Sequence, residues 1–190
     1  MIYKVSILKI EFANLLLTAS LFIGSFLVVA LIITPLQSVA LPIDYASILF
    51  LPHGVRIFAV VFYGPARGFL YLLLSSIAVE LILDGGSAIS MSLIGHIIGA
   101  GCVPVAMMLL RFGFGGEAIS LQHVDRRTWR GLLLLILISS LINSLLQTVM
   151  VHASDLTVTD IYLSLRFILG DVLGAAVMLL GANVLLKRWV

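Results

Sequence analysis

The sequence predicts an all-α membrane protein: a bundle of six transmembrane helices in one domain, residues 1–190, with both termini in the cytoplasm. Hydrophobic residues make up 62% of the chain and charged residues only 11%. Soluble domains are roughly half apolar and about a quarter charged. A chain of 190 residues cannot bury so much apolar surface in one soluble core, so lipid must solvate much of it. Its apolar residues also fall into long runs separated by short polar segments.

Six of these runs can cross a bilayer, which takes about 20 residues of helix. The first continues to Pro35 without a small-residue cleavage site, so we expect an uncleaved span rather than a signal peptide. Leu51-Pro52-His53-Gly54 breaks the second helix, either to form a binding site or to shape packing. Pro104 is expected to kink the fourth. The predicted spans cover residues 14–34, 43–63, 68–83, 88–110, 131–151 and 161–186.

Loop charge predicts the orientation, because Lys and Arg collect in cytoplasmic loops. Basic residues occur at both ends of the chain, in the turn before the third span and in the loop before the fifth. The alternate loops contain no Lys or Arg and hold Asp44, Asp84, Asp155 and Asp160. This pattern predicts an inner-membrane protein with both ends inside. The small net charge of +2, spread over these loops, argues against a nucleic-acid partner.

Polar side chains inside the predicted spans gather between mid-membrane and the outer surface. Each buried charge costs at least about 2.5–3.5 kcal/mol, so it needs a partner or a wet cavity. We expect Asp171 to pair with Arg56, and Glu80 to meet Arg166 or His96. Taken singly, each residue is explained by helix packing, but four charges on one side of the membrane favour an outward-facing pocket for a small-molecule ligand. Its predicted residues are His53, Arg56, Glu80, His96, Asn143, Gln147, Arg166 and Asp171.

Two GxxxG motifs, Gly95 to Gly99 and Gly170 to Gly174, predict close helix packing within the bundle rather than dimerisation. The sequence has no nucleotide-binding loop, no metal-ligand spacing and no plausible setting for a catalytic serine. With the single Cys102, disulfides and Cys-based metal sites are also excluded. We therefore expect a protein that is not an enzyme and has no cofactor and no metal.

Three short motifs resemble the MASE1 integral membrane sensory domain. Leu51-Pro52-His53-Gly54-Val55-Arg56, with a turn at Gly64 and another span, is similar to its Pro-x-Gly region. Ile168-Leu169-Gly170-Asp171-Val172-Leu173-Gly174 resembles its Gly-Asp-x-x-Gly helix, and Val124-Asp125-Arg126-Arg127 fits its pattern before the fifth span. The resemblance implies a sensory or ligand-binding module that acts with a signalling output, here a partner protein.

The chain is also similar to the substrate-binding subunits of energy-coupling-factor vitamin transporters, which have six spans in about this length. Those subunits dock to a partner through small residues of the first span, and Ser20-x-x-x-Gly24 is the nearest match here. This alternative implies a vitamin-like solute and a transporter partner. A structural subunit of a membrane complex is the third alternative. In all three, the partners are the lipid bilayer and another protein.

Overall fold

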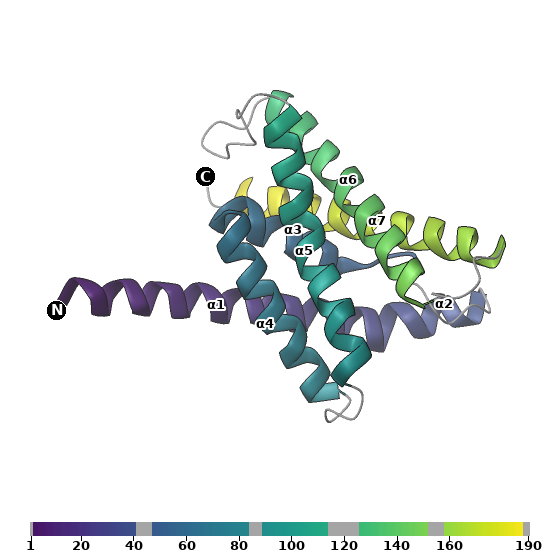
Figure 1. Cartoon of the computed structure of the whole chain (residues 1–190), viewed down its shortest axis with the longest axis horizontal. Coiled ribbons are helices and arrows are strands. Elements are labelled where there is room, and N and C mark those ends of the chain that lie inside the picture. The colour runs from purple at the N-terminus through teal and green to yellow at the C-terminus, as the bar shows by residue number, and fades with distance from the viewer. Residues whose placement is uncertain (1, 41–46, 84–88, 114–125, 152–157, 188–190) are drawn as a thin grey trace.

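A computed structural model shows an all-helical chain and describes residues 2–40, 47–83, 89–113, 126–151 and 158–187 (Figure 1). The first helix has two labelled parts, α1 and α2, joined by a π-helical turn at Val29–Ile33, so the described residues form six separate helices. The elements are α1 (Ile2–Val28), α2 (Thr34–Ala40), α3 (Leu51–Tyr63), α4 (Pro65–Leu83), α5 (Ile89–Gly113), α6 (Arg126–Val151) and α7 (Val158–Lys187).

Five of the described helices are long and apolar enough to cross a membrane. Their outer faces carry large exposed apolar side chains, for example Leu31 at 70% and Leu180 at 63% exposure, as lipid-facing helices require. The loops with Asp44, Asp84 and Asp155, and Val124 and Asp125 of the third motif, lie outside the described residues. The five spans are Lys9–Val39, Pro65–Ile82, Leu93–Gly113, Thr128–Met150 and Ile161–Val184.

The first helix runs past Pro35, where the sequence predicted a loop. Pro35 has no N–H, and in a regular α-helix its ring would collide with the carbonyl group four residues back. The π-helical turn just before it widens the helix: the Thr34 N–H donates to the Val29 carbonyl, five residues back. Such single wide turns occur within otherwise regular helices. The predicted end at residue 34 is therefore wrong, and the helix continues to Ala40.

The second predicted span, residues 43–63, differs most from the structure. Helix α3 begins only at Leu51 and has 13 residues. Pro52 lies in its first turn, where a missing N–H leaves no hydrogen bond unmade. The predicted break at Pro52–Gly54 is thus a helix start. Residues 47–50 precede it as a non-helical segment, and residues 43–46 lie outside the described part of the chain.

Three backbone N–H groups of that non-helical segment have protein partners. Ile48 donates to Gln37 Oε1 of α2 (3.1 Å) and Leu49 to Ser47 Oγ (3.3 Å). Phe50 donates to the carbonyl of Gly170 on α7 (2.9 Å). Protein atoms therefore satisfy these three N–H groups, as non-helical backbone inside a membrane would require.

Gly64 makes the tight connection between α3 and α4. Its φ of +82° is favourable only for glycine. Its N–H caps α3 by donating to the Val60 carbonyl (2.9 Å), and its own carbonyl accepts from the Gly68 N–H of α4 (2.9 Å). The two helices therefore follow each other with no further loop residue.

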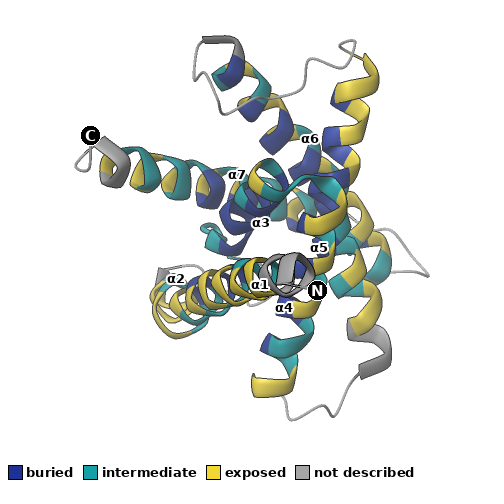
Figure 2. Cartoon of the chain, turned by 90° about the vertical axis from the view of Figure 1, so that its left-hand side faces the viewer, coloured by how far each residue is buried: buried dark blue, intermediate teal, exposed yellow. Residues whose placement is uncertain are grey.

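Helix α3 is the central element, and α1, α4, α5 and α7 all pack against it. The longer helices are not all aligned with one another: α1 and α7 run across α4 and α5 in both views (Figures 1 and 2). Small residues permit a close crossing of α3 and α7, because a Cβ on Gly54 would lie 2.5 Å from the Cβ of Met178.

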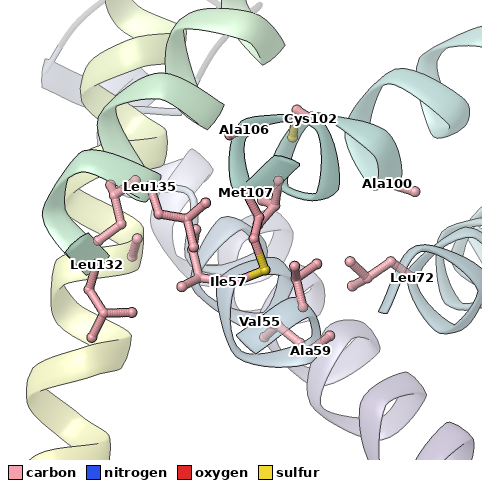
Figure 3. Packing of buried hydrophobic residues seen from close by; sticks show 14 of the residues in the cluster. Val55, Ile57, Ala59, Leu72, Ala100, Cys102, Ala106, Met107, Leu132 and Leu135 are labelled. Atoms are coloured by element: carbon pink, nitrogen blue, oxygen red, sulfur yellow. The ribbon is translucent and has the colours of Figure 1, made fainter. Parts of the chain in front are cut away.

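The apolar core surrounds α3 (Figure 3). Val55, Ile57 and Val60 of α3 are at most 1% exposed. They pack with Leu72 of α4 and with side chains of α5 and α6, among them Met107 and Leu135. One end of α3 is thus fixed in a close-packed interior, and the polar residues of its first turn are held in place by that packing.

Candidate functional site

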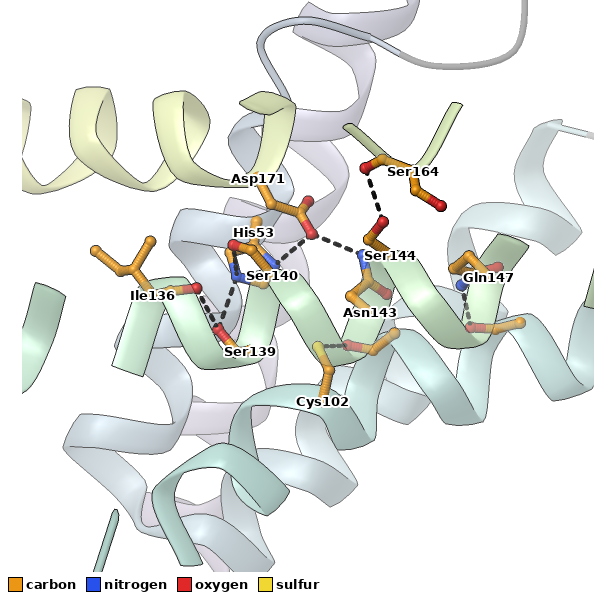
Figure 4. A network of polar contacts seen from close by, with 12 residues as sticks. His53, Cys102, Ile136, Ser139, Ser140, Asn143, Ser144, Gln147, Ser164 and Asp171 are labelled. Atoms are coloured by element: carbon orange, nitrogen blue, oxygen red, sulfur yellow. Dashed lines mark hydrogen bonds and ion pairs between the residues drawn. The ribbon is translucent and has the colours of Figure 1, made fainter. Parts of the chain in front are cut away.

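Three helices contribute one side chain each to a buried polar centre (Figure 4). Asp171 of α7 is 1% exposed, His53 of α3 is fully buried and Asn143 of α6 is 4% exposed. Asn143 Nδ2 donates to Asp171 Oδ2 at 2.7 Å, and His53 Nδ1 lies 3.4 Å from the same oxygen, an ion-pair distance when the ring is protonated. The structure therefore brings together three of the predicted pocket residues.

Two serines of α6 extend the centre on the other side of the imidazole ring. His53 Nε2 lies 3.0 Å from Ser139 Oγ and 3.5 Å from Ser140 Oγ. Asp, His and Ser in this order resemble a hydrolase triad. However, Ser139 is fully buried and its hydroxyl already donates to the Ile136 carbonyl (3.1 Å). Ser139 is thus placed as a hydrogen-bonding partner of the ring and not as an accessible nucleophile.

Arg56 does not pair with Asp171, so that prediction is wrong: the ion-pair partner that the described residues give Asp171 is His53. Arg56 follows His53 by almost one turn of α3 and takes another direction. Its guanidinium lies beside Gly99 of α5, where a Cβ would be 2.5 Å from Nη2. Its Cζ is 5.8 Å from the ring centre of Phe22 and 5.4 Å from that of Phe50. Exchanging the two charges is therefore not expected to restore stability.

The other predicted pocket residues lie on α4, α5, α6 and α7, outside this centre. Glu80 of α4 contacts His96 of α5, one of the two partners expected for it. Gln147 of α6 donates to the carbonyl of Gly95, next to His96 (3.2 Å). Arg166 is partly buried on α7. The contacts thus place Glu80, His96 and Gln147 in a second polar group between α4, α5 and α6.

Serine and threonine residues of α6 were missed by the sequence analysis. Ser140, Ser144 and Thr148 recur every four residues and form a buried stripe. Ser144 Oγ donates to the carbonyl of Ser164 on α7 (2.7 Å), and Thr148 Oγ1 lies 2.7 Å from Ser164 Oγ. The i, i+4 spacing was the available signal, since it puts the three side chains on one helix face.

The predicted packing glycines lie against different neighbours. On α7, a Cβ on Gly170 would collide with the Ser47 carbonyl and one on Gly174 with the Phe50 carbonyl, so this GxxxG motif holds the non-helical segment before α3. On α5, Gly99 makes room for Arg56, while a Cβ on Gly95 would make only ordinary contact with Met150 (3.4 Å). Only close packing was predicted, and the sequence could not show what fills each groove.

The five apolar helices and the buried polar centre define the class: the chain is a multi-pass helical membrane protein. Comparison with family models, with curated proteins and with solved structures gives no match. In the residues that the structure describes, no group of three or more His, Cys, Asp or Glu side chains is placed to hold a metal ion.

Proposed function

We propose that this protein is a non-enzymatic sensory or ligand-binding membrane module, related to MASE1 domains, whose site is the polar centre around His53. The observation that carries the proposal is the meeting of His53, Asn143 and Asp171 from three helices at almost zero exposure. Ionisable groups inside a membrane are costly and usually functional. Two of these residues belong to the motifs that resemble the MASE1 family.

The polar centre also links parts of the chain that a signal would have to move together. It joins α3, α6 and α7 through side chains, and the segment before α3 is attached to α7 by the Phe50 to Gly170 hydrogen bond. A ligand that alters the His53–Asp171 contact would shift α7 relative to α3. Such a displacement is a route by which a bound ligand changes the surface offered to a signalling partner.

The proposed topology has six crossings with both ends in the cytoplasm. The 13 residues of α3 give about 20 Å of helix, short of the roughly 30 Å hydrocarbon core. The four non-helical residues before it add at most about 14 Å. Together they suffice, and the bonded N–H groups of this segment make such a crossing acceptable in lipid.

The second candidate function is solute capture for a transporter. Ser20 and Gly24 on α1 are exposed, and no atom lies within 4 Å of a Cβ built on Gly24. Small residues uncovered on the first helix are what the vitamin-transporter resemblance implies for docking to a partner. This candidate predicts an ATPase module as the partner, whereas the sensory proposal predicts a signalling protein.

Native mass spectrometry of protein purified in mild detergent tests the proposal. We expect a small molecule bound at one per chain, retained by the parent protein and lost in Asp171→Ala. Gly181→Ala is the matched control, because that glycine lies on the same helix with open space around it. A protein that carries no small molecule and is held in a fixed-stoichiometry complex would instead support the structural-subunit alternative.

A further inference from the structure

Two hydrogen-bond donor atoms of Arg56 have no partner among the described residues. The residue is 8% exposed, and its Nε and Nη1 are buried without a hydrogen-bond partner. Its described contacts are with the rings of Phe22 and Phe50 and with Gly99, and none of these side chains carries a hydrogen-bond acceptor. A buried guanidinium with unused donors is unfavourable, because burial without hydrogen bonds costs the hydration of the charge.

The surroundings of Arg56 suit an anion better than another protein side chain. The guanidinium itself occupies the space that Gly99 leaves, and the rings of Phe22 and Phe50 come from two different elements beside it. A carboxylate accepts charge-assisted hydrogen bonds from guanidinium N–H groups, and these are stronger than neutral ones. The rings would contact the apolar body of such a molecule.

We infer that Arg56 binds the carboxylate of an organic monoanion between α1, α3 and α5. This inference rests on the proposed ligand-binding function and names the chemical class of the ligand. A monoanion is favoured over a dianion because Arg56 is the one cation that the described contacts place here. A second negative charge would meet repulsion without compensation.

Thermal unfolding in detergent micelles tests the inference with defined probes. Sodium acetate and sodium butyrate are compared with sodium chloride and sodium phosphate at equal ionic strength. A ligand that binds only the folded state raises the melting temperature with concentration. We expect the two carboxylates to raise it, butyrate more than acetate because of its apolar chain, and phosphate to behave like chloride.

Two substitutions assign the effect to the guanidinium. Arg56→Met should abolish the carboxylate-dependent shift without lowering the melting temperature in chloride, since Met fills similar space and brings no unpaired donor. Arg56→Lys keeps the charge but not the planar set of donors, so binding should weaken about tenfold to a hundredfold. Arg111→Met is the control, because Arg111 is exposed in the last turn of α5.

Each other outcome contradicts the inference in a recognisable way. An Arg56-dependent shift with phosphate alone would replace the carboxylate by a phosphate ligand. No shift with any anion, together with a destabilised Arg56→Met, would make Arg56 a structural residue. If native mass spectrometry finds a neutral or cationic ligand that Arg56→Met still binds, this inference fails while the proposed function stands. If no small molecule is bound at all, both fail.

Discussion

At the scale of single residues, Asp171 is the centre of the polar network. Its Oδ2 accepts from the Asn143 amide and faces the His53 ring, so both neighbours are positioned by one oxygen. The ring in turn fixes the two serines of α6. Removing one partner from such a network leaves buried polar atoms unsatisfied, which costs more than the net value of the lost hydrogen bond.

We expect Asp171→Ala to lower the free energy of unfolding by about 1–3 kcal/mol, because it leaves the Asn143 amide and the His53 ring without their partner. Asp171→Asn should cost less, since an amide oxygen of the same shape can still accept from Asn143. Equilibrium unfolding in mixed micelles measures both changes. Equal stability of Asp171→Ala and the parent would show that this carboxylate has no part in holding α6 and α7 together.

A double-mutant cycle identifies which partner of Asp171 matters. For Asn143→Ala with Asp171→Ala we expect a coupling of about 0.6 kcal/mol, and no more than about 1.7, the range for interhelical hydrogen bonds in membranes. The cycle of Arg56→Ala with Asp171→Ala should give a smaller coupling, since the two side chains are not in contact. The reverse order of the two couplings would favour the direct Arg56–Asp171 pair that the sequence suggested.

At the scale of elements, the crossing of α7 over the segment before α3 depends on glycine. A Cβ on Gly174 would overlap the Phe50 carbonyl and lie 2.8 Å from the Leu51 nitrogen, both backbone atoms that cannot move aside cheaply. We expect Gly174→Ala to destabilise the protein by about 1–3 kcal/mol, as overpacking does. Gly181→Ala on the same helix meets no neighbour and should be neutral or slightly stabilising by helix propensity. Unfolding in micelles compares the two.

The N-terminal half of α1 is tied to α4 by a second contact between elements. Glu11 accepts a hydrogen bond from the Tyr71 hydroxyl and pairs with Arg67 Nη2 at 3.2 Å. Tyr71 is 4% exposed and Arg67 is 65% exposed. The hydrogen bond to Tyr71 is thus shielded from water, whereas the ion pair with Arg67 is solvated. The buried partner should therefore provide most of the stabilisation.

We expect Tyr71→Phe to cost about 1 kcal/mol of unfolding free energy, the net value of a typical buried hydrogen bond. Arg67→Gln should change it by no more than a few tenths, because exposed ion pairs contribute little. Thermal melting of both variants at low and high salt measures this, and salt should affect only the contribution of Arg67. A larger loss for Arg67→Gln would mean that the ion pair, and not the tyrosine, holds α1 to α4.

At the scale of the whole molecule, the sequence predicts what depends on local composition. Runs of apolar residues identified the long helices, since length and hydropathy are what mark a membrane-spanning helix. The start of α3 at Leu51 and the passage of the first helix through Pro35 depend on tertiary contacts and a π-helical turn, which no local pattern specifies. His53, Asn143 and Asp171 were found because polar residues in apolar runs are conspicuous. Their actual pairing depends on the crossing of α3 and α7, which only the structure shows.

The number of times the chain crosses the membrane depends on α3. If the segment before α3 and α3 itself cross the bilayer together, Val39 lies on the outer side and Arg67 on the cytoplasmic side, as does Phe112 after α4 and α5. All three side chains are exposed, whereas Cys102 is buried and should not react.

Single cysteines at 39, 67 and 112 are labelled with a membrane-impermeant maleimide in cells and in inverted vesicles. We expect Val39→Cys to react in cells, and Arg67→Cys and Phe112→Cys in inverted vesicles. Labelling of 39 and 67 from the same side would mean that α3 enters and leaves by one surface, which puts the termini on opposite sides and contradicts the charge pattern of the loops.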